Sequence, residues 1–262
     1  MSLKFSQIFS NSLSGESRTL PQQCECGANN NRFCNQTGLK NHWNFPPFIN
    51  LPDEYDIDED YYVLDTTIGC YMPFRHWVLF GEIEQNLSDF IRARVEMKSR
   101  FGERFIVHFH LEDAEVPAFF GCHELRPGST IAIFYPYVHE FMDLSTGIRQ
   151  TNSRTAMVFP ASFEILAIEY DFIRGATQSP DTCCVCHGRS ASPIKRCKNC
   201  KLATYCSKDC QVIHWKKSHK KFCSKYSGIL SRLSKIDFSD FQSHYDWNFV
   251  APSDLEIQIT TL

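Results

Sequence analysis

The central part of the chain, from about residue 61 to residue 175, alternates short apolar runs with polar turns. The runs are rich in Val, Ile, Phe and Tyr. In several of them apolar and polar side chains alternate, which is typical of half-buried β-strands. Five runs are predicted to be strands, at 76–83, 89–97, 104–112, 129–138 and 155–168.

Turn signals separate these runs. The stretch KSRFGERF between the second and third runs predicts a hairpin, and the Pro-Gly of ELRPGS predicts a turn before the fourth run. The stretch PAFFGCHEL (117–125) is expected to be a short helix or a loop. Five strands with a helix before the fourth resemble an OB-fold in number and spacing, which implies a small closed or half-closed β-barrel over 61–175. A fragment of a β-sandwich is the main alternative.

The regions that flank this barrel are less regular. Residues 1–60 are rich in Ser, Asn, Pro and acidic groups and are predicted to be mostly irregular, and 174–182 is predicted to be a linker. Residues 224–262 are expected to form a helix and a tail. The helix carries an apolar face, which predicts that it packs on the protein's own core. This face is formed by Ile229, Leu230, Leu233 and Ile236. The expected class is therefore α+β, mainly β, with a cysteine-rich module at 183–223.

Charge is distributed unevenly, although the net charge is only −3. Residues 183–226 hold 11 Lys and Arg and one acidic residue, Asp209, and therefore carry +10, whereas the rest of the chain carries −13. Seven of the acidic residues lie in 51–65. The basic and acidic segments could attract each other, but a solvated acidic linker is the simpler interpretation.

The sequence has no signal for export or membrane insertion. No run of about 18 uncharged apolar residues occurs, so no membrane contact is expected. The first 20 residues lack the apolar centre of a secretory signal and hold too few arginines for a typical transit peptide. We therefore expect a protein of the cytoplasm, the nucleus or both, whose cysteines are thiols or metal ligands rather than disulfides.

The cysteine-rich module carries the strongest chemical signal. Two pairs of cysteines have the Cys-x2-Cys spacing of a zinc knuckle, and two further pairs have i,i+4 spacing, which places both ligands on one helical face. Zinc takes four such thiolate and imidazole ligands tetrahedrally, and a closed site leaves no position for a catalytic water. Two structural zinc ions are therefore predicted. Their predicted ligands are Cys183, Cys186, Cys197, Cys200, Cys206, Cys210, His219 and Cys223.

The module also needs metal in order to fold. It contains few large aliphatic residues, so its apolar area is too small to stabilise so short a unit, and metal binding is expected to supply the missing free energy. Cys184 is left without a metal because Cys183 has the x2 spacing to Cys186. His214 lies one helical turn from Cys210 and is expected to be a packing or surface residue, since eight ligands are already assigned.

The order of these pairs resembles the MYND-type zinc finger. The stretch TYCSKDCQVIHWKKSHKKFC (204–223) is similar to the C-terminal half of that family nearly position by position. Three residues separate Trp215 from His219, where some members have two. The resemblance implies that Ser207 caps the helix that bears Cys210 and that Trp215 is a buried aromatic.

The resemblance also implies interleaved ligation, which spacing alone does not decide. The first and third pairs would hold one zinc ion, and the second and fourth pairs would hold the other.

Two hypotheses for function follow. The resemblance to the MYND family implies that the finger is a protein-interaction module. Members of that family often bind short proline- and leucine-rich peptides in extended form, which lose little entropy on binding. The surface expected to bind such a peptide includes Ala203, Thr204, Gln211 and Trp215. The chain would then be an adaptor. The alternative is a nucleic-acid-binding protein that uses the basic finger and the OB-like barrel, although the barrel segment is not basic.

No catalytic function is expected. A family of SET-domain lysine methyltransferases also contains MYND fingers, but the Asn-His-Ser-Cys and Gly-Glu-Glu-Leu-like stretches of that family do not occur here. No phosphate-binding glycine loop or Gly-x-Ser-x-Gly motif occurs either. Two weaker metal candidates stay open. One comprises Cys24, Cys26, Cys34 and His42, and the other is the pair His108 and His110 on one strand face.

Overall fold

A computed structural model describes residues 34, 36–89, 92–111, 125–152, 155–188, 193–223 and 225–241. The predictions for 1–33, for most of 117–125 and for 242–262 fall outside these residues. Within the described ranges, no helix is both long and apolar enough to cross a membrane.

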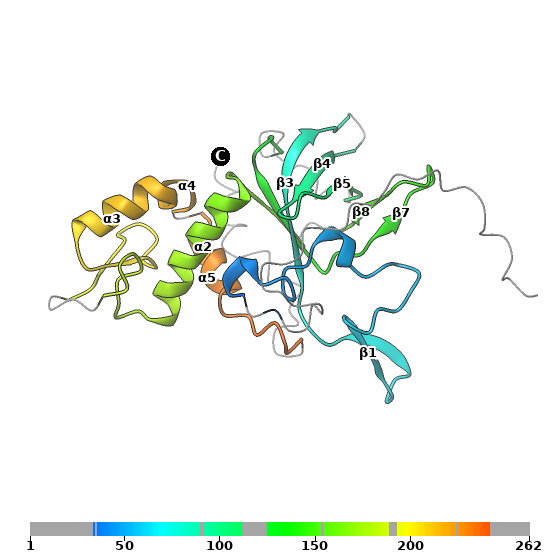
Figure 1. The fold of residues 1–262 in the computed structure, drawn as a ribbon, viewed down its shortest axis with the longest axis horizontal. Helices are drawn as coiled ribbons and strands as arrows, with labels where there is room; N and C mark the ends of the chain where they lie inside the picture. Colours follow the sequence, from blue (N-terminus) through cyan, green and yellow to red (C-terminus); the bar gives the residue numbers. More distant parts are fainter. Residues whose placement is uncertain are drawn as a thin grey trace, which may run out of the picture.

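A seven-stranded sheet forms the centre of the molecule (Figure 1). Its strands are β3 (Val78–Asn86), β4 (Arg94–Ser99), β5 (Arg104–Phe109), β6 (Thr130–Phe134), β7 (His139–Glu140), β8 (Thr146–Gln150) and β9 (Ala156–Phe159). The order is β7-β8-β5-β4-β3-β6-β9, and only the β5–β8 pair is parallel. The first four predicted strands are confirmed as β3 to β6, and the predicted hairpin is the β4–β5 turn, in which Gly102 has φ +89°.

The sheet is half-closed. Strand β8 pairs with β5 on one side of the sheet, and β9 pairs with β6 on the other side. Only residues 151–155 separate β8 from β9 in the chain, so one continuous stretch links the two sides, although no ladder joins the described strands β8 and β9. This arrangement is like the partly open barrel of an OB-fold.

Strands β3 and β6 are buried on both faces. Leu79 and Ile131 belong to an inner core that also contains Trp77. Phe80 and Phe134 belong to a second core on the opposite face of the sheet. Because successive side chains of a strand point to opposite faces, a strand that is covered twice is expected to be apolar on both faces, as residues 131–134 of β6 are.

The prediction that 155–168 is a single strand is wrong, and so is the linker predicted at 174–182. Strand β9 ends at Phe159, and helix α2 (Phe163–Gln178) occupies the rest of the run and the start of the linker.

The sequence contains the reason for this change of structure. Pro160 cannot continue a strand ladder, and beyond it the apolar positions recur at helical spacing. Leu166, Tyr170 and Ile173 are all buried on one face of α2. The high β-propensity of the individual residues is overridden by this periodicity, because the stripe packs along the second core.

A two-stranded hairpin that the sequence pattern did not predict projects from the sheet (Figure 1). It consists of β1 (Tyr62–Asp65) and β2 (Cys70–Pro73), with Gly69 at φ +69° in the turn. Each strand has only four residues and shows no alternation of apolar and polar side chains, which is why the sequence pattern did not predict this hairpin. Before the hairpin, the described part of the predicted irregular region contains only the single-turn helices η2 (Gly38–Lys40) and η3 (Phe48–Asn50).

The second core is shared between the sheet and the cysteine-rich module. Helix α2 lies between them (Figure 1), and α5 (Ser227–Leu233) packs beside α2. Leu230 and Leu233 of α5 are buried in this core, which confirms the predicted apolar face of that helix. Tyr205 and Phe222 of the module lie in the same core. The module is therefore packed into the rest of the chain, while its domain boundaries stay a prediction.

Candidate metal centres

The cysteine-rich module lies beyond α2, at one end of the molecule (Figure 1). It contains a short antiparallel ladder of β10 (Lys195–Arg196) and β11 (Thr204–Tyr205). A continuous helical stretch follows, formed by α3 (Lys208–His214), the π-helical η5 (Trp215–His219) and α4 (Lys220–Phe222).

The eight predicted ligands come together in two groups of four. We call the group Cys183, Cys186, Cys206 and Cys210 site 1, and the group Cys197, Cys200, His219 and Cys223 site 2. The ligand atoms of each group all lie within 4.8 Å of one another. The pairs are therefore interleaved, as the family resemblance implies.

The spacing of the sulfur atoms fits zinc. Tetrahedral ligands at a Zn–S distance of about 2.3 Å lie about 3.8 Å apart. In site 1 the Sγ atom of Cys206 lies 3.6 Å from Cys186 Sγ and 3.6 Å from Cys210 Sγ. In site 2 the Sγ atoms of Cys197 and Cys223 lie 3.7 Å apart. Cys200 Sγ lies 3.6 Å from His219 Nε2, so the imidazole presents the correct nitrogen to the same point.

Hydrogen bonds favour the ionised form of one cysteine in each knuckle. Burial acts to raise the pKa of Cys183, but the N–H groups of Cys186, Cys206 and Val185 lower that pKa to about 6. Burial likewise opposes the ionisation of Cys200, whose pKa is lowered to about 6 by His219 and by backbone N–H groups. A lowered pKa favours the thiolate, which is the form that binds metal.

The two knuckles share one backbone geometry. The amide of His187 donates to Cys183 O at 2.8 Å, and the amide of Lys201 donates to Cys197 O at 2.9 Å. Both residues have positive φ, 57° and 59° respectively. The turn that points two sulfurs at one ion needs a left-handed residue four positions after the first cysteine, and here a non-glycine residue takes that conformation in both sites.

The helical stretch supplies ligands to both sites. Its start is capped as expected, because Ser207 Oγ accepts from the Cys210 amide at 3.2 Å. The extra residue between Trp215 and His219 is accommodated in the π-helical turn η5. Such a turn closes its hydrogen bonds over five residues, so side chains five apart come to the same side. His214 and His219 accordingly stack with ring centroids 4.5 Å apart.

A carboxylate from outside the module fixes His219. Glu169 on α2 is fully buried, and its Oε1 accepts from His219 Nδ1 at 2.8 Å. Its Oε2 accepts from His214 Nε2 at 2.9 Å and from Ser218 Oγ at 2.7 Å. Burial acts to raise the pKa of Glu169, but the hydrogen bonds from His214 and His219 lower it to about 2. The carboxylate holds the His219 proton on Nδ1 and leaves Nε2 for the metal.

The sequence analysis missed Glu169. One signal could have revealed it, since this residue stands three positions after Leu166 and one before Tyr170, within the apolar stripe of α2. A charged residue in such a stripe needs a buried partner.

The four residues expected to bind a peptide differ in exposure. Ala203 and Thr204 are buried, whereas Gln211 is exposed and Trp215 is 41% exposed. The expectation that Trp215 is a buried aromatic is therefore wrong. The buried aromatic positions of the module are occupied by Tyr205 and Phe222.

The remaining cysteine and histidine candidates lie outside the two sites. Cys184 is buried, and burial raises its pKa to about 12, which favours the inert thiol. His214 is a buried packing residue that also contacts Tyr205 Oη through Nδ1 at 3.0 Å. Cys24 and Cys26 lie outside the described residues. Within those residues, no group of potential metal ligands includes Cys34 or His42.

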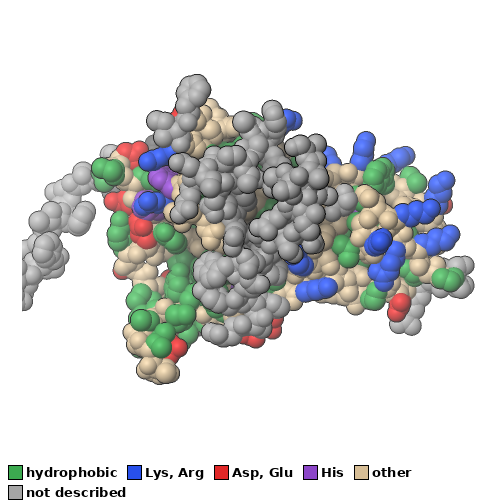
Figure 2. Space-filling model, turned by 180° about the vertical axis from the view of Figure 1, so that it is seen from behind, with side chains coloured by type: hydrophobic (Ala, Val, Ile, Leu, Met, Phe, Trp, Pro, Cys, Tyr) green, Lys and Arg blue, Asp and Glu red, His purple; other side chains and the backbone are tan. Residues whose placement is uncertain are grey.

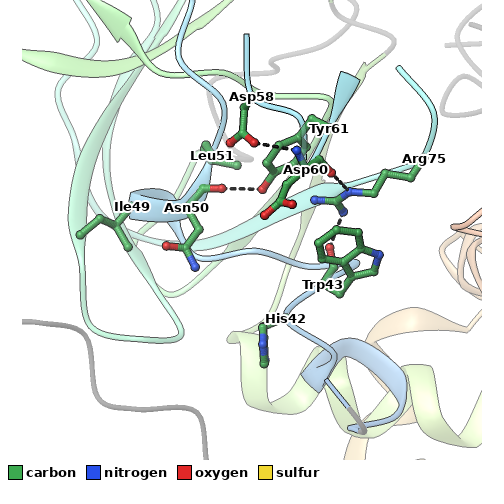
Figure 3. A pocket seen from close by; sticks show the side chains of 9 residues that line it. All are labelled: His42, Trp43, Ile49, Asn50, Leu51, Asp58, Asp60, Tyr61 and Arg75. Atoms are coloured by element: carbon green, nitrogen blue, oxygen red, sulfur yellow. Dashed lines mark hydrogen bonds between the residues drawn. The ribbon is translucent and has the colours of Figure 1, made fainter. Parts of the chain in front are cut away.

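A cavity of about 270 Å³ lies on the sheet side, next to η3 (Figure 3). Two aromatic rings in its wall already hold a cation, because the Arg75 guanidinium lies 3.8 Å from the Trp43 ring centroid and 4.1 Å from that of Tyr61. The same group donates to the backbone oxygens of Asp60 and Trp43. This aromatic cage holds the chain's own cation and serves to anchor the segment before β1.

Comparison with protein families assigns the module. Residues 183–223 match the family model described as the MYND finger. This segment is a MYND finger. Zinc is the metal of such a finger, and the two groups of four ligands fit two zinc ions.

Curated relatives resemble short stretches of the chain. The Ubiquitin C-terminal hydrolase 15 of Oryza sativa subsp. japonica is 44% identical over 47 residues, 18% of this chain and 4% of that protein. A SET and MYND domain-containing protein of Dictyostelium discoideum is 52% identical over 42 residues, 16% of this chain and 8% of that protein. These matches span less than a tenth of the relatives' length, so no activity of the whole proteins follows from them.

Solved structures resemble the chain only weakly. Schizosaccharomyces pombe Pot1pC bound to ssDNA is 8% identical, covers 35% of this chain and 84% of that one, and has a TM-score of 0.26. A replication protein A heterotrimer bound to ssDNA is 10% identical, covers 40% and 70%, and has a TM-score of 0.24. At these TM-scores the likeness supports no statement about function.

Proposed function

We propose that this protein is an adaptor rather than an enzyme, and that its MYND finger binds short, extended peptides rich in proline and leucine. The MYND finger is a protein-interaction module. The peptide class and the binding surface are the parts that need a test.

Exposed Trp215 is the observation that carries the proposal. It is 41% exposed on a helical stretch that also bears Cys210 and His219 and is followed directly by Cys223. Metal ligands on both sides hold the backbone of this residue rigid, so little entropy is lost when a partner covers the indole. A rigid, exposed tryptophan is typical of the centre of a protein interface, and its flat ring suits proline.

The other three residues contribute in different ways. Gln211 is exposed one turn before Trp215 and can donate to and accept from a peptide backbone. Ala203 and Thr204 are buried, so their side chains cannot touch a ligand. The Thr204 carbonyl already accepts from the Cys184 amide at 3.0 Å, which leaves β11 a structural role.

Peptide display against the zinc-loaded full chain tests this function. The full chain is needed because the finger shares its core with α2 and α5. Wild type is compared with Trp215→Ala and with Tyr71→Ala, which removes an aromatic residue that is 45% exposed on the distant hairpin. We expect enrichment of proline- and leucine-containing peptides that Trp215→Ala abolishes and Tyr71→Ala retains.

Two results would count against the adaptor. One is a lack of enrichment from protein with a verified content of two zinc ions. The other is enrichment that survives Trp215→Ala.

A second candidate, the binding of single-stranded nucleic acid, is favoured by one surface of the sheet. His108 is the register partner of Arg94 on one side and Arg149 on the other. Its ring lies 4.2 Å from that of Phe141. Burial lowers the pKa of His108, and Arg94 lowers it further, while Asp143 acts in the opposite direction. Cations beside ring faces suit phosphates and stacked bases.

The anisotropy of a labelled single-stranded oligonucleotide separates the two candidates. If this surface binds, Arg94→Ala with Arg149→Ala should weaken binding and flatten its salt dependence, and the exposed control Arg126→Ala should not. Equal affinity of all three proteins would remove this surface from consideration.

A further inference from the structure

We propose that the finger of one molecule docks the acidic segment of a second copy of the same chain. The docking surface is the outer face of the helical stretch, which we call the basic face and define by Val212, Ile213, Trp215, Lys216, Lys217, Lys220 and Lys221. The occupant is the stretch 53–60, which we call the acidic face.

The basic face combines apolar and cationic side chains. Val212, Ile213 and Trp215 are 39%, 52% and 41% exposed, although each is a large hydrophobic residue. The lysines line a hollow of about 410 Å³ next to Trp215. Figure 2 shows that Lys and Arg side chains gather over this end of the molecule. An exposed apolar cluster beside four lysines is typical of a protein interface for an acidic, partly apolar partner.

The acidic face has the complementary composition. The stretch DEYDIDED holds six carboxylates and no cation. Between these carboxylates, Tyr55 is 73% exposed and Ile57 is 54% exposed. The adjoining β1–β2 hairpin adds Val63 and Ile68, which are 52% and 59% exposed. The acidic face therefore places apolar side chains between carboxylates, and the basic face places apolar side chains beside lysines, so the two faces are complementary in both charge and hydrophobicity.

The two faces cannot meet within one molecule. The finger lies at one end of the fold, and the stretch before β1 lies on the far side of the sheet (Figure 1). The acidic face is also tied down there, because Asp53 forms a β-bridge with Val138 and Glu54 Oε2 lies 2.7 Å from His139 Nδ1. Since each molecule has one face of each kind at opposite ends, contact between them must be intermolecular and heterologous.

The apolar residues favour a second protein chain over nucleic acid on this face. Lysines alone would serve phosphates, but Val212 and Ile213 present aliphatic surface that a nucleic acid backbone does not use. Tyr55 and Ile57 offer a matching apolar surface with carboxylates on both sides.

Sedimentation velocity of the zinc-loaded full chain over a concentration series tests the proposal. We expect concentration-dependent self-association. Raising the salt from about 0.1 M to about 1 M shortens the Debye length from about 10 Å to about 3 Å and should weaken the association at least about tenfold.

Paired variants locate the contact. Lys216→Glu with Lys220→Glu changes the charge of the basic face from +4 to 0, and Asp56→Lys with Glu59→Lys changes that of the acidic face from −6 to −2, at positions that are all exposed. Each variant alone should be monomeric. Arg126→Glu with Lys235→Glu makes the same charge change as the first variant at exposed positions elsewhere, and should associate like wild type. Zinc content is measured for every variant, so that loss of the finger is not mistaken for loss of the contact.

Mixing the two face variants provides the decisive readout. The Lys216→Glu, Lys220→Glu molecule keeps a wild-type acidic face, and the Asp56→Lys, Glu59→Lys molecule keeps a wild-type basic face, so the mixture contains one unaltered pair of faces. The mixture should therefore associate again. A monomeric wild type, face variants that still associate, or a mixture that stays monomeric would each overturn the proposal. A monomeric wild type whose basic face binds a labelled oligonucleotide would assign that face to nucleic acid instead.

Discussion

The two metal sites use similar ligand pairs but differ in what surrounds them. Site 1 lies toward the surface, and Cys186 is exposed. In site 2, His219 is buried and hydrogen-bonded to Glu169, a residue of α2 that lies outside the finger. Site 1 therefore organises the finger itself, whereas site 2 also joins the finger to the helix that covers the sheet. Two similar zinc sites can thus serve a local and a long-range structural role, depending on the residues around the ligands.

The largest difference between the sites should appear when one ligand is removed from each. His219→Ala leaves the Glu169 carboxylate buried with one charge-stabilising partner fewer, and we expect a loss of about 3–5 kcal/mol in the free energy of unfolding of the whole chain. Cys206→Ala should also lose one zinc ion but should unfold mainly the exposed part of the finger. Metal content and calorimetry report both effects. Equal destabilisation by the two variants would show that the sites are not distinct.

Replacing the carboxylate tests the link without touching a ligand. Glu169→Gln should lower zinc affinity at site 2 by about 10–100-fold, because the neutral amide has one acceptor oxygen for the three donors of His214, Ser218 and His219 and orients His219 less firmly. It should also cost about 2–3 kcal/mol in the free energy of unfolding, as hydrogen bonds to a charged group are lost.

Chelator competition and the visible spectrum of the cobalt-substituted protein measure these effects. Glu164→Gln is the matched control, since Glu164 is exposed on the same helix. An unchanged affinity in Glu169→Gln would reduce Glu169 to a packing residue.

The order of metal release should follow the difference in burial. During slow chelation we expect site 1 to open first, because local opening needs less buried structure to be disrupted. Timed alkylation with mass spectrometry should label Cys186 and Cys206 before Cys197 and Cys223. Simultaneous labelling of all four would mean that the finger opens as one unit.

The smallest effect should be the same in both sites. His187 and Lys201 hold the left-handed position of the two knuckles, which favours glycine. His187→Gly and Lys201→Gly should each raise the free energy of unfolding, by up to about 1 kcal/mol. Thermal melts of the zinc-loaded protein test this. A different increase in the free energy of unfolding for the two variants would show that the residues around each site also affect its knuckle turn.

Local patterns predicted much of this molecule. The spacing of the cysteine pairs, the Ser207 cap and the apolar face of α5 depend on neighbours within a few residues, so they can be read from sequence. Helix α2 was missed because its sequence is rich in residues with high β-propensity. Its helical periodicity becomes clear only when Pro160 is taken as the point where the strand stops.

The residues that can bind zinc are recognisable from the sequence, because ligand chemistry and spacing are local properties. The packing of the folded chain brings Cys186 beside Cys206 and Cys197 beside Cys223, since this pairing depends on how distant turns meet. It also decided that Glu169, some 50 positions away, completes site 2. A carboxylate on α2 reaches His219 only when the second core brings that helix and the finger together, and no local pattern encodes that approach.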